Sequence, residues 1–313
     1  MTRRSLVRRV RRWRPSVFGS SGFPWSAPTW PTDLERPAPE RGLGVDYDTT
    51  WAREYPARLA RAVVLDTITR PLAHVVASPE VRGADVLSLV DPPVIFVANH
   101  TSHADTPILL SVLPARLRHK TVVAAAADHF FDRRWKAHLW AGALALIPIE
   151  RHRVNRRSAQ LAADLVNDGW NLVIYPEGGR SHDGWFADFR GGAAYLATRT
   201  ARPVVPVHID GTWGILPRGS NRLHRSPTTV SFGNPIVPVE GDHTRRLEAR
   251  IETALATLAD ETRTDWWTAR RRAAAGTTPS PRGPDAAAWR RAWELGRVSA
   301  AADDDNRWAL ERR

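Results

Sequence analysis

An apolar run leads directly into polar residues in the segment Val94-Ile95-Phe96-Val97-Ala98-Asn99-His100-Thr101-Ser102-His103-Ala104-Asp105-Thr106-Pro107. The β-branched and aromatic residues at its start are typical of a buried strand. Pro107 suits the first turn of a helix, because the N–H that proline lacks is not needed there. The segment therefore predicts a strand, a short loop and a helix, with His100 at the end of the strand and Asp105 near the helix start.

The distance along the chain between His100 and Asp105 predicts how they can meet. Residues five apart on a continuous helix point about 140° away from each other, so a contact requires the bent loop. A histidine held by a carboxylate at the mouth of a sheet is a good general base. We therefore expect His100 and Asp105 to be the catalytic residues, although a buried histidine capped by a nearby carboxylate would have the same local pattern.

Composition narrows the class of protein. The chain has 313 residues, 42% of them hydrophobic, which suits one large α/β domain with appendages. There is no cysteine, which excludes thiolate catalysis, disulfides and cysteine-bound metal.

No apolar run reaches the roughly 18 residues of a transmembrane helix, and the N-terminus lacks the apolar core of a secretory signal. We expect a cytoplasmic protein that is peripheral on the inner face of the cell membrane.

Positive charge is concentrated at the N-terminus. The net charge is +12, and residues 1–14 contain many arginines but no acidic residue. Arginines mixed with Trp13 and aliphatic residues suit an anionic membrane surface. Nucleic acid or a solvated, disordered tail are alternatives for such an arm. We expect the membrane surface to be the partner and expect no nucleic acid.

The pattern along the chain predicts four parts: a basic, Pro-rich, irregular arm (1–45), an amphipathic helical segment (46–84), a core domain (85–262) and a helical or partly disordered tail (263–313). In the second part, Leu59, Val63, Val64, Ile68 and Leu72 recur at helical spacing, and Pro71 is expected to kink or break the helix.

Within the core domain, strand candidates alternate with helix candidates. The strand candidates are 93–98, 121–126, 143–149, 172–175, 203–209 and 228–232, and the clearest helices are 154–168 and 244–262. Alternation of this kind predicts an α/β fold with a mainly parallel or mixed sheet flanked by helices.

Three further blocks end strands with polar or charged residues. A loop with paired glycines follows one strand in Tyr175-Pro176-Glu177-Gly178-Gly179-Arg180-Ser181, a second strand delivers Arg151 at its end, and a third contains Val205-Pro206-Val207. Glycines permit close approach of backbone to a ligand, and arginine suits a phosphate. The prolines of the third strand indicate an edge position in the sheet.

These four blocks, in this order, resemble the motifs of the glycerolipid (lysophospholipid) acyltransferase family, which includes bacterial 1-acylglycerol-3-phosphate acyltransferases. Asn99-His100 with Asp105 is similar to the Asn-His-x4-Asp motif, and residues 175–181 are similar to Phe-Pro-Glu-Gly-Thr-Arg-Ser. The resemblance covers about residues 85–240. It implies a glycerolipid acyltransferase-like α/β fold for the domain 85–262.

The resemblance also implies a reaction. His100 would remove a proton from an acceptor hydroxyl, which attacks the thioester of acyl-CoA or acyl carrier protein, while Asp105 orients the imidazole. No other cofactor and no metal would be needed. The positions that would line the acceptor's head-group site are Glu177, Gly178, Gly179, Arg180 and Arg151. The acceptor would be a lysophospholipid similar to lysophosphatidic acid.

Two departures from the family pattern concern the acceptor. Gly179 replaces the usual threonine, and Asp128 lies in a segment where many members have a lysine. A glycolipid or another hydroxyl compound is therefore an alternative acceptor, and a non-catalytic membrane- or nucleic-acid-binding protein is the alternative outside enzymes. His103 lacks further partners in a metal-binding pattern, and Ser102 lies in no Gly-x-Ser-x-Gly elbow, so we interpret both as supporting residues.

Overall fold

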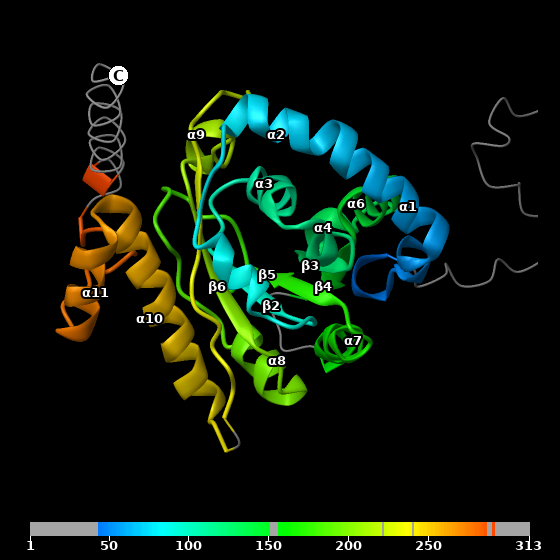
Figure 1. The fold of residues 1–313 in the computed structure, drawn as a ribbon. Helices are drawn as coiled ribbons and strands as arrows, with labels where there is room; N and C mark the ends of the chain where they lie inside the picture. The colour runs from blue at the N-terminus through cyan, green and yellow to red at the C-terminus, as the bar shows by residue number, and fades with distance from the viewer. Residues whose placement is uncertain (1–42, 151–155, 221, 240, 287–289, 292–313) are drawn as a thin grey trace, which may run out of the picture. The chain divides into compact units, whose positions relative to one another are not determined.

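The structure, a computed structural model, describes residues 43–150, 156–220, 222–239, 241–286 and 290–291 (Figure 1). Most of the arm predicted for residues 1–45, the site residue Arg151 and the tail beyond residue 291 lie outside the described residues. Among the described residues, no helix is both long enough and apolar enough to cross a membrane.

Strands and helices alternate through the chain. The strands are β1 (Glu80–Arg82), β2 (Ile95–Ala98), β3 (Thr121–Ala126), β4 (Leu146–Ile149), β5 (Asn171–Ile174), β6 (Val204–Asp210) and β7 (Thr229–Phe232). The α-helices are α1 (Tyr55–Val64), α2 (Arg70–Ala77), α3 (Asp105–Val112), α4 (Ala115–Arg118), α5 (Ala127–Phe130), α6 (Arg134–Leu144), α7 (Arg156–Asn167), α8 (Gly192–Thr200), α9 (Thr212–Ile215), α10 (Thr244–Arg263) and α11 (Trp266–Ala274). Short 3₁₀ helices are η1 (Gly44–Asp46), η2 (Thr50–Arg53) and η4 (Ala84–Ser88), and η3 (Leu65–Thr69) is a π-helical turn.

The strands form one mixed sheet in the order β1-β7-β6-β2-β5-β3-β4. The strands β6, β2, β5, β3 and β4 are parallel to one another, whereas β7 runs antiparallel to β6 and pairs in parallel with β1. The predicted α/β class with a mainly parallel or mixed sheet is confirmed. Because five strands are parallel, their carboxyl ends meet at one edge of the sheet.

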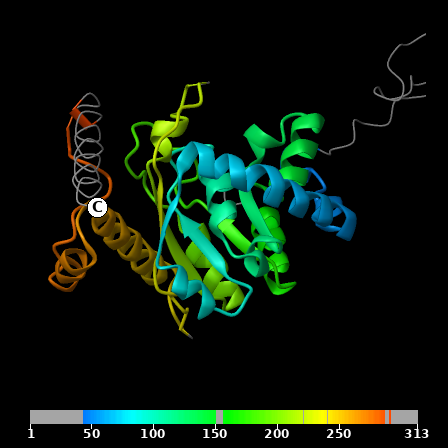
Figure 2. The same ribbon diagram turned by 45° about the horizontal axis from the view of Figure 1, so that its top comes forward.

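Helices cover both faces of the sheet. Alternate residues of β2 point to opposite faces, with Phe96 in one apolar cluster and Ile95 and Val97 in the other. The first cluster contains residues of α2, α3 and α6, and the second contains residues of α7, α8 and α10. Figures 1 and 2 show α1 and α2 on one side of the sheet and α10 on the other. Burial on both faces explains why the strands read as continuous apolar runs.

The expected edge position of the proline-containing strand is wrong. β6 lies inside the sheet, between β2 and β7. The ladder with β7 begins at the pair Val207 and Phe232, and the Pro206 carbonyl still accepts the Gly233 N–H at 2.8 Å. The N–H that proline lacks therefore falls in the break between that ladder and the isolated bridge of Val204 with Ile236, where its loss costs little.

Two other boundaries differ from the sequence prediction. The strand expected at 143–149 begins only at Leu146, because Ala143 and Leu144 end α6 and Ala145 adopts a left-handed conformation at its cap. Pro71 does not end the N-terminal helix. The chain stays helical from α1 to α2, and the wider π turn η3 precedes the proline, whose nitrogen cannot donate to a carbonyl one turn back.

Candidate functional site

The parallel strands bring the predicted motifs to one edge of the sheet. β2 lies between β6 and β5, so His100 after β2, Glu177 after β5 and Thr212 after β6 are neighbours. β4, which precedes Arg151, is separated from β5 by β3. The central site is therefore built from the ends of three adjacent strands.

His100 and Asp105 meet as the loop predicts. His100 Nδ1 lies 2.8 Å from Asp105 Oδ2, and the carboxylate, which only accepts hydrogen bonds, assigns the proton to Nδ1. The imidazole's basic nitrogen is then Nε2. The histidine side chain is 13% exposed and the aspartate side chain is fully buried. This pair can accept a proton from a hydroxyl group at Nε2 and stabilise the resulting imidazolium.

Both carboxylate oxygens of Asp105 accept hydrogen bonds. The backbone N–H groups of Thr101 and Ser102 donate to Oδ2 at 2.8 and 2.9 Å, and the Thr212 hydroxyl donates to Oδ1. Several donors hold a buried carboxylate in one orientation. Thr212 comes from the start of α9, more than 100 residues away in sequence, and sequence reasoning did not identify it.

Asn99 and Tyr175 complete the frame around His100. The Asn99 side chain exchanges two hydrogen bonds of 2.8 Å with the backbone of Ile209, which ties the end of β2 to β6. Tyr175 stacks on the His100 ring, with centroids 4.2 Å apart, and its hydroxyl lies 2.9 Å from Thr106 Oγ1. The ring of Tyr175 therefore fixes the plane of the imidazole, a role that its place after an apolar strand did not reveal.

Glu177, which the sequence assigns to the acceptor site, is buried. Its Oε1 accepts the His100 N–H at 2.7 Å and its Oε2 accepts the Ala187 N–H at 2.9 Å. Burial raises the pKa of Glu177 to about 8, because the loss of hydration outweighs the effect of the two N–H donors. In this structure the carboxyl group links the backbone at His100 to the loop after β5.

Arg180 and the two glycines lie on the same loop, partly exposed. Gly178 has φ +68°, a conformation that suits glycine, and Arg190 packs against it. Burial, and then the nearby Arg218, lower the pKa of Arg180, and the charge of Asp105 opposes them. Arg180 is thus the partly exposed cation of this loop that interacts with the charge of the buried pair.

Residues 78–210 match the protein-family model described as Acyltransferase. The match contains the strand ends that carry His100, Glu177 and Ile209. This part of the chain therefore matches an acyltransferase domain. The resemblance expected from the sequence motifs is therefore confirmed at the level of the family.

Several named proteins are similar to this acyltransferase domain. The chain is 28% identical over 166 residues to the chloroplastic 1-acyl-sn-glycerol-3-phosphate acyltransferase BAT2 of Brassica napus, a match covering 52% of the chain and 46% of that protein. It is 29% identical over 199 residues to the human 1-acyl-sn-glycerol-3-phosphate acyltransferase alpha, covering 59% of the chain and 65% of that protein. The chain thus spans about half to two thirds of the length of these curated relatives.

A solved structure is also similar, that of the 1-acyl-sn-glycerophosphate (LPA) acyltransferase PlsC from Thermotoga maritima. The sequence identity is 21% and the TM-score is 0.49, over 66% of this chain and 86% of that one.

The other polar residues of the acyltransferase motif have structural partners. The Ser102 hydroxyl donates to the Leu216 carbonyl at 3.0 Å and accepts the Ala104 N–H at 3.1 Å. Burial, followed by the charges of Arg180 and His100, lowers the pKa of His103 to about 4, so this imidazole is neutral at pH 7. Ser102 therefore shapes the loop, and His103 is a neutral ring that stacks on His129.

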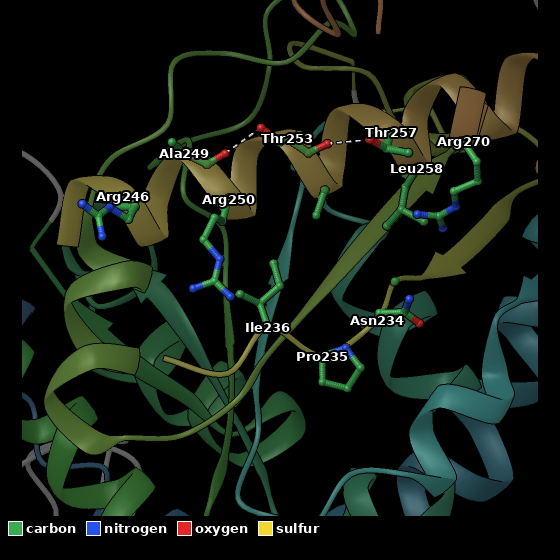
Figure 3. A pocket seen from close by; sticks show the side chains of 12 residues that line it. Asn234, Pro235, Ile236, Arg246, Ala249, Arg250, Thr253, Thr257, Leu258 and Arg270 are labelled. Atoms are coloured by element: carbon green, nitrogen blue, oxygen red, sulfur yellow. Dashed lines mark hydrogen bonds between the residues drawn. The ribbon is translucent and has the colours of Figure 1, made fainter. Parts of the chain in front are cut away.

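A groove of about 530 Å³ lies at a different place in the acyltransferase fold, between α10, α11 and the segment after β7 (Figure 3). Its rim carries Arg246, Arg250 and Arg270 above an apolar floor with Ile236. Because β7 is antiparallel to β6, its carboxyl end lies at the edge of the sheet opposite His100. None of the predicted site residues that the structure describes lines this groove.

Proposed function

We propose that the protein transfers a fatty acyl group from a thioester to a hydroxyl of a lysophospholipid similar to 1-acylglycerol-3-phosphate. The observation that carries this proposal is the His100–Asp105 pair, which lies within a domain of the acyltransferase family. Curated relatives of this domain are named 1-acyl-sn-glycerol-3-phosphate acyltransferases, which supports phospholipid synthesis as the setting.

In the proposed step His100 Nε2 removes the proton of the acceptor hydroxyl. At the same time the hydroxyl oxygen attacks the carbonyl carbon of the thioester. The tetrahedral intermediate collapses, the C–S bond breaks, and the proton on His100 passes to the departing thiolate. Asp105 stabilises the transient imidazolium through the 2.8 Å contact at Nδ1. The step forms an ester and a thiol and uses no other cofactor or metal.

Recognition of the acceptor is assigned to the loop after β5. Arg180 is a partly exposed cation near Asp105 and His103, and a guanidinium pairs well with a phosphate. Gly178 and Gly179 let the backbone approach the head group. Glu177 supports this loop from below through its two hydrogen bonds, and Arg151 is proposed as a second cation of the head-group site.

The experiment is acyl transfer from labelled acyl-CoA, and in parallel from acyl carrier protein, to a panel of lysophospholipids and glycolipids. We expect a phosphate-bearing acceptor to be used, and His100→Ala to lower turnover by roughly 10³-fold or more. A folded His100→Ala protein with nearly normal turnover would contradict the mechanism. Activity confined to acceptors without a phosphate would instead select the glycolipid alternative.

We further propose that the protein works at an anionic membrane surface, which it contacts through the exposed face of α1 and α2. Leu59, Val63, Ile68, Leu72 and Val75 are each 52–59% exposed. Exposed Trp135 and Leu139 lie on α6, which packs against α1. Contiguous exposed apolar side chains with an aromatic residue at the rim are typical of helices that lie in a lipid interface.

The π turn explains how this face stays continuous. On an uninterrupted α-helix Ile68 would be rotated by about 140° from Val63, which would separate the two halves of the stripe. The turn η3 accommodates one extra residue between them. Both halves consequently face outward, whereas Leu65, Ala73 and Ala77 on the other side are buried.

Vesicle sedimentation tests this contact with the full chain. The triple variant Leu59→Glu/Ile68→Glu/Leu72→Glu should bind vesicles of phosphatidylglycerol and phosphatidylcholine at least about tenfold more weakly. Leu89→Glu is the matched control, since Leu89 is 77% exposed but lies outside this helix. Equal binding by the triple variant and the control would refute the contact between this face and the membrane. Deletion of residues 1–14 measures the part of the binding that is due to the arginine-rich arm.

A further inference from the structure

The loop after β5 has little regular structure of its own. Residues 175–190, which we name the acceptor loop, connect β5 to α8 without a helix or strand. Ten of its residues follow Arg180, the proposed acceptor ligand. A loop of this length keeps one conformation only if other parts of the chain hold it.

On its inner side the acceptor loop is tied to the catalytic histidine. The Ser181 N–H donates to the His100 carbonyl at 2.8 Å. Glu177 accepts from Ala187 in the same loop and from the His100 N–H. These bonds fix the inner side of the loop to the backbone at His100.

On its outer side the acceptor loop is held by residues 281–286 and 290–291, which together we name the strap. Arg291 Nε lies 2.6 Å from Asp183 Oδ2, and the Arg291 carbonyl accepts the Trp185 Nε1–H at 3.1 Å. The Phe186 N–H donates to the Pro281 carbonyl at 3.2 Å. The Arg291–Asp183 pair is only about a quarter exposed, so it is less screened by solvent than a surface ion pair.

Trp185 is the centre of this contact. Its side chain is buried, the Arg263 guanidinium lies 4.3 Å from its ring centre, and Gly283 packs directly against it. A Cβ on Gly283 would lie 2.4 Å from Trp185 Cδ2, and Gly283 has φ +76°. Only glycine therefore fits at this position without moving the ring.

We propose that the strap positions the acceptor loop for binding of the acceptor head group, and that Arg291 is its main positioning residue. This inference rests on the proposed function, because Arg180 is assigned to the acceptor there. The strap does not touch the reacting atoms. Loosening it should weaken binding of the acceptor and leave the site of the acyl donor unchanged.

The test compares Arg291→Met with Arg291→Lys and Arg290→Met in the full-length protein. Arg290 is the exposed neighbour in the chain, so it controls for the loss of one positive charge. We expect Arg291→Met to raise KM for the lysophospholipid about tenfold, with kcat and the KM for the donor within about twofold of wild type. Arg291→Lys should recover part of this loss, and Arg290→Met should behave like wild type.

Three more variants separate positioning from general destabilisation. Asp183→Asn should raise the acceptor KM in the same way, and the double variant should add little to either single change, because both remove one contact. Gly283→Leu should also raise the acceptor KM, because the added side chain displaces the ring of Trp185. Unchanged acceptor KM in folded Arg291→Met, or equal loss for donor and acceptor, would overturn the proposal.

Hydrogen exchange gives a readout that does not depend on acyl transfer. In Arg291→Met the amides of Phe186 and Ala187 should exchange faster, while those of β2 and β6 keep their protection. If wild type transfers no acyl group but this exchange pattern holds, the proposed function fails and the structural link stands. If exchange in residues 181–190 is unchanged, the strap is refuted whatever the activity.

Discussion

The loops after β2 and β5 face the same site but are stabilised in different ways. The first is short, and its carboxylate, Asp105, receives donors from the adjacent backbone of Thr101 and Ser102. The second is long, and its carboxylate, Glu177, joins residues that are distant in sequence. The first loop is set largely by local geometry, whereas the second depends on contacts made by remote parts of the chain.

This difference separates chemistry from recognition. The group that is proposed to move the proton lies on the short loop, where few atoms can shift. The groups proposed to bind the acceptor lie on the long loop, where loosening a remote contact reorients them. Substitutions in the first loop should therefore affect kcat, and substitutions around the second should affect acceptor binding or pH-dependent stability.

Asp105→Asn should have the largest effect. The amide keeps the shape but can no longer stabilise an imidazolium or enforce the proton on Nδ1, so kcat should fall by about 10³–10⁴-fold. Turnover and circular dichroism measured together check this. A folded variant that loses less than about tenfold would show that the short loop is not where the proton is moved.

Glu177→Gln should change how stability depends on pH. Burial raises the pKa of Glu177 to about 8, so between about pH 4.5 and 8 the unfolded chain releases a proton that the folded protein retains. The contribution of Glu177 to stability is therefore greatest below about pH 4.5 and is lost as the pH rises toward 8. The variant should lack this decline, which we expect to be on the order of 4 kcal/mol. Urea unfolding at pH 5, 6, 7 and 8 measures it, and parallel curves for the two proteins would contradict it.

Thr212→Val should have a smaller effect on the short loop. It removes the hydroxyl that donates to Asp105 Oδ1 and keeps the side-chain volume. We expect kcat to fall about tenfold, since an unsatisfied buried carboxylate oxygen costs about 1–3 kcal/mol. Thr200→Val is a control, because its buried hydroxyl only donates to a helical carbonyl. An equal loss in both variants would mean that Thr212 acts through stability alone.

Tyr175→Phe should have the smallest effect. The ring that stacks on His100 remains, and only the 2.9 Å contact with Thr106 is lost. We expect less than about a fivefold change in kcat, equivalent to about 1 kcal/mol. Tyr175→Leu, which removes the stacked ring, should cost more. If the two variants are equal, stacking does not orient the imidazole.

The sequence predicted the parts of the fold that depend on short patterns. Apolar runs located β2, β3, β5, β6 and β7 to within a residue or two, because buried parallel strands need continuous apolar residues. It failed at Ala143 and Leu144, where an apolar stretch extends the end of a helix. It also failed for β6, because a missing N–H matters only where a neighbouring strand would have used it.

In the site, too, the sequence predicted the features that depend on short patterns. The contact of His100 with Asp105 follows from the residues between them, and the glycines near Arg180 indicated a ligand loop. The side chains of Thr212, Tyr175 and Asn99 reach His100 or its carboxylate from other strands. Their residue types are ordinary, so no local signal distinguishes them.

By itself the sequence determined most of the strands, the helix-opening loop that joins His100 to Asp105, and the motifs that carry the family resemblance, because each strand, loop and motif is a pattern of about ten residues or fewer. Only the tertiary structure showed that the Glu177 carboxyl is buried and accepts hydrogen bonds from the backbone of His100 and Ala187. It alone also showed that the apolar stripe of α1 and α2 is exposed and that residues 281–286 and 290–291 lie against the acceptor loop. These features depend on which surfaces the sheet and its helices leave uncovered, and that is set by the packing of the whole chain.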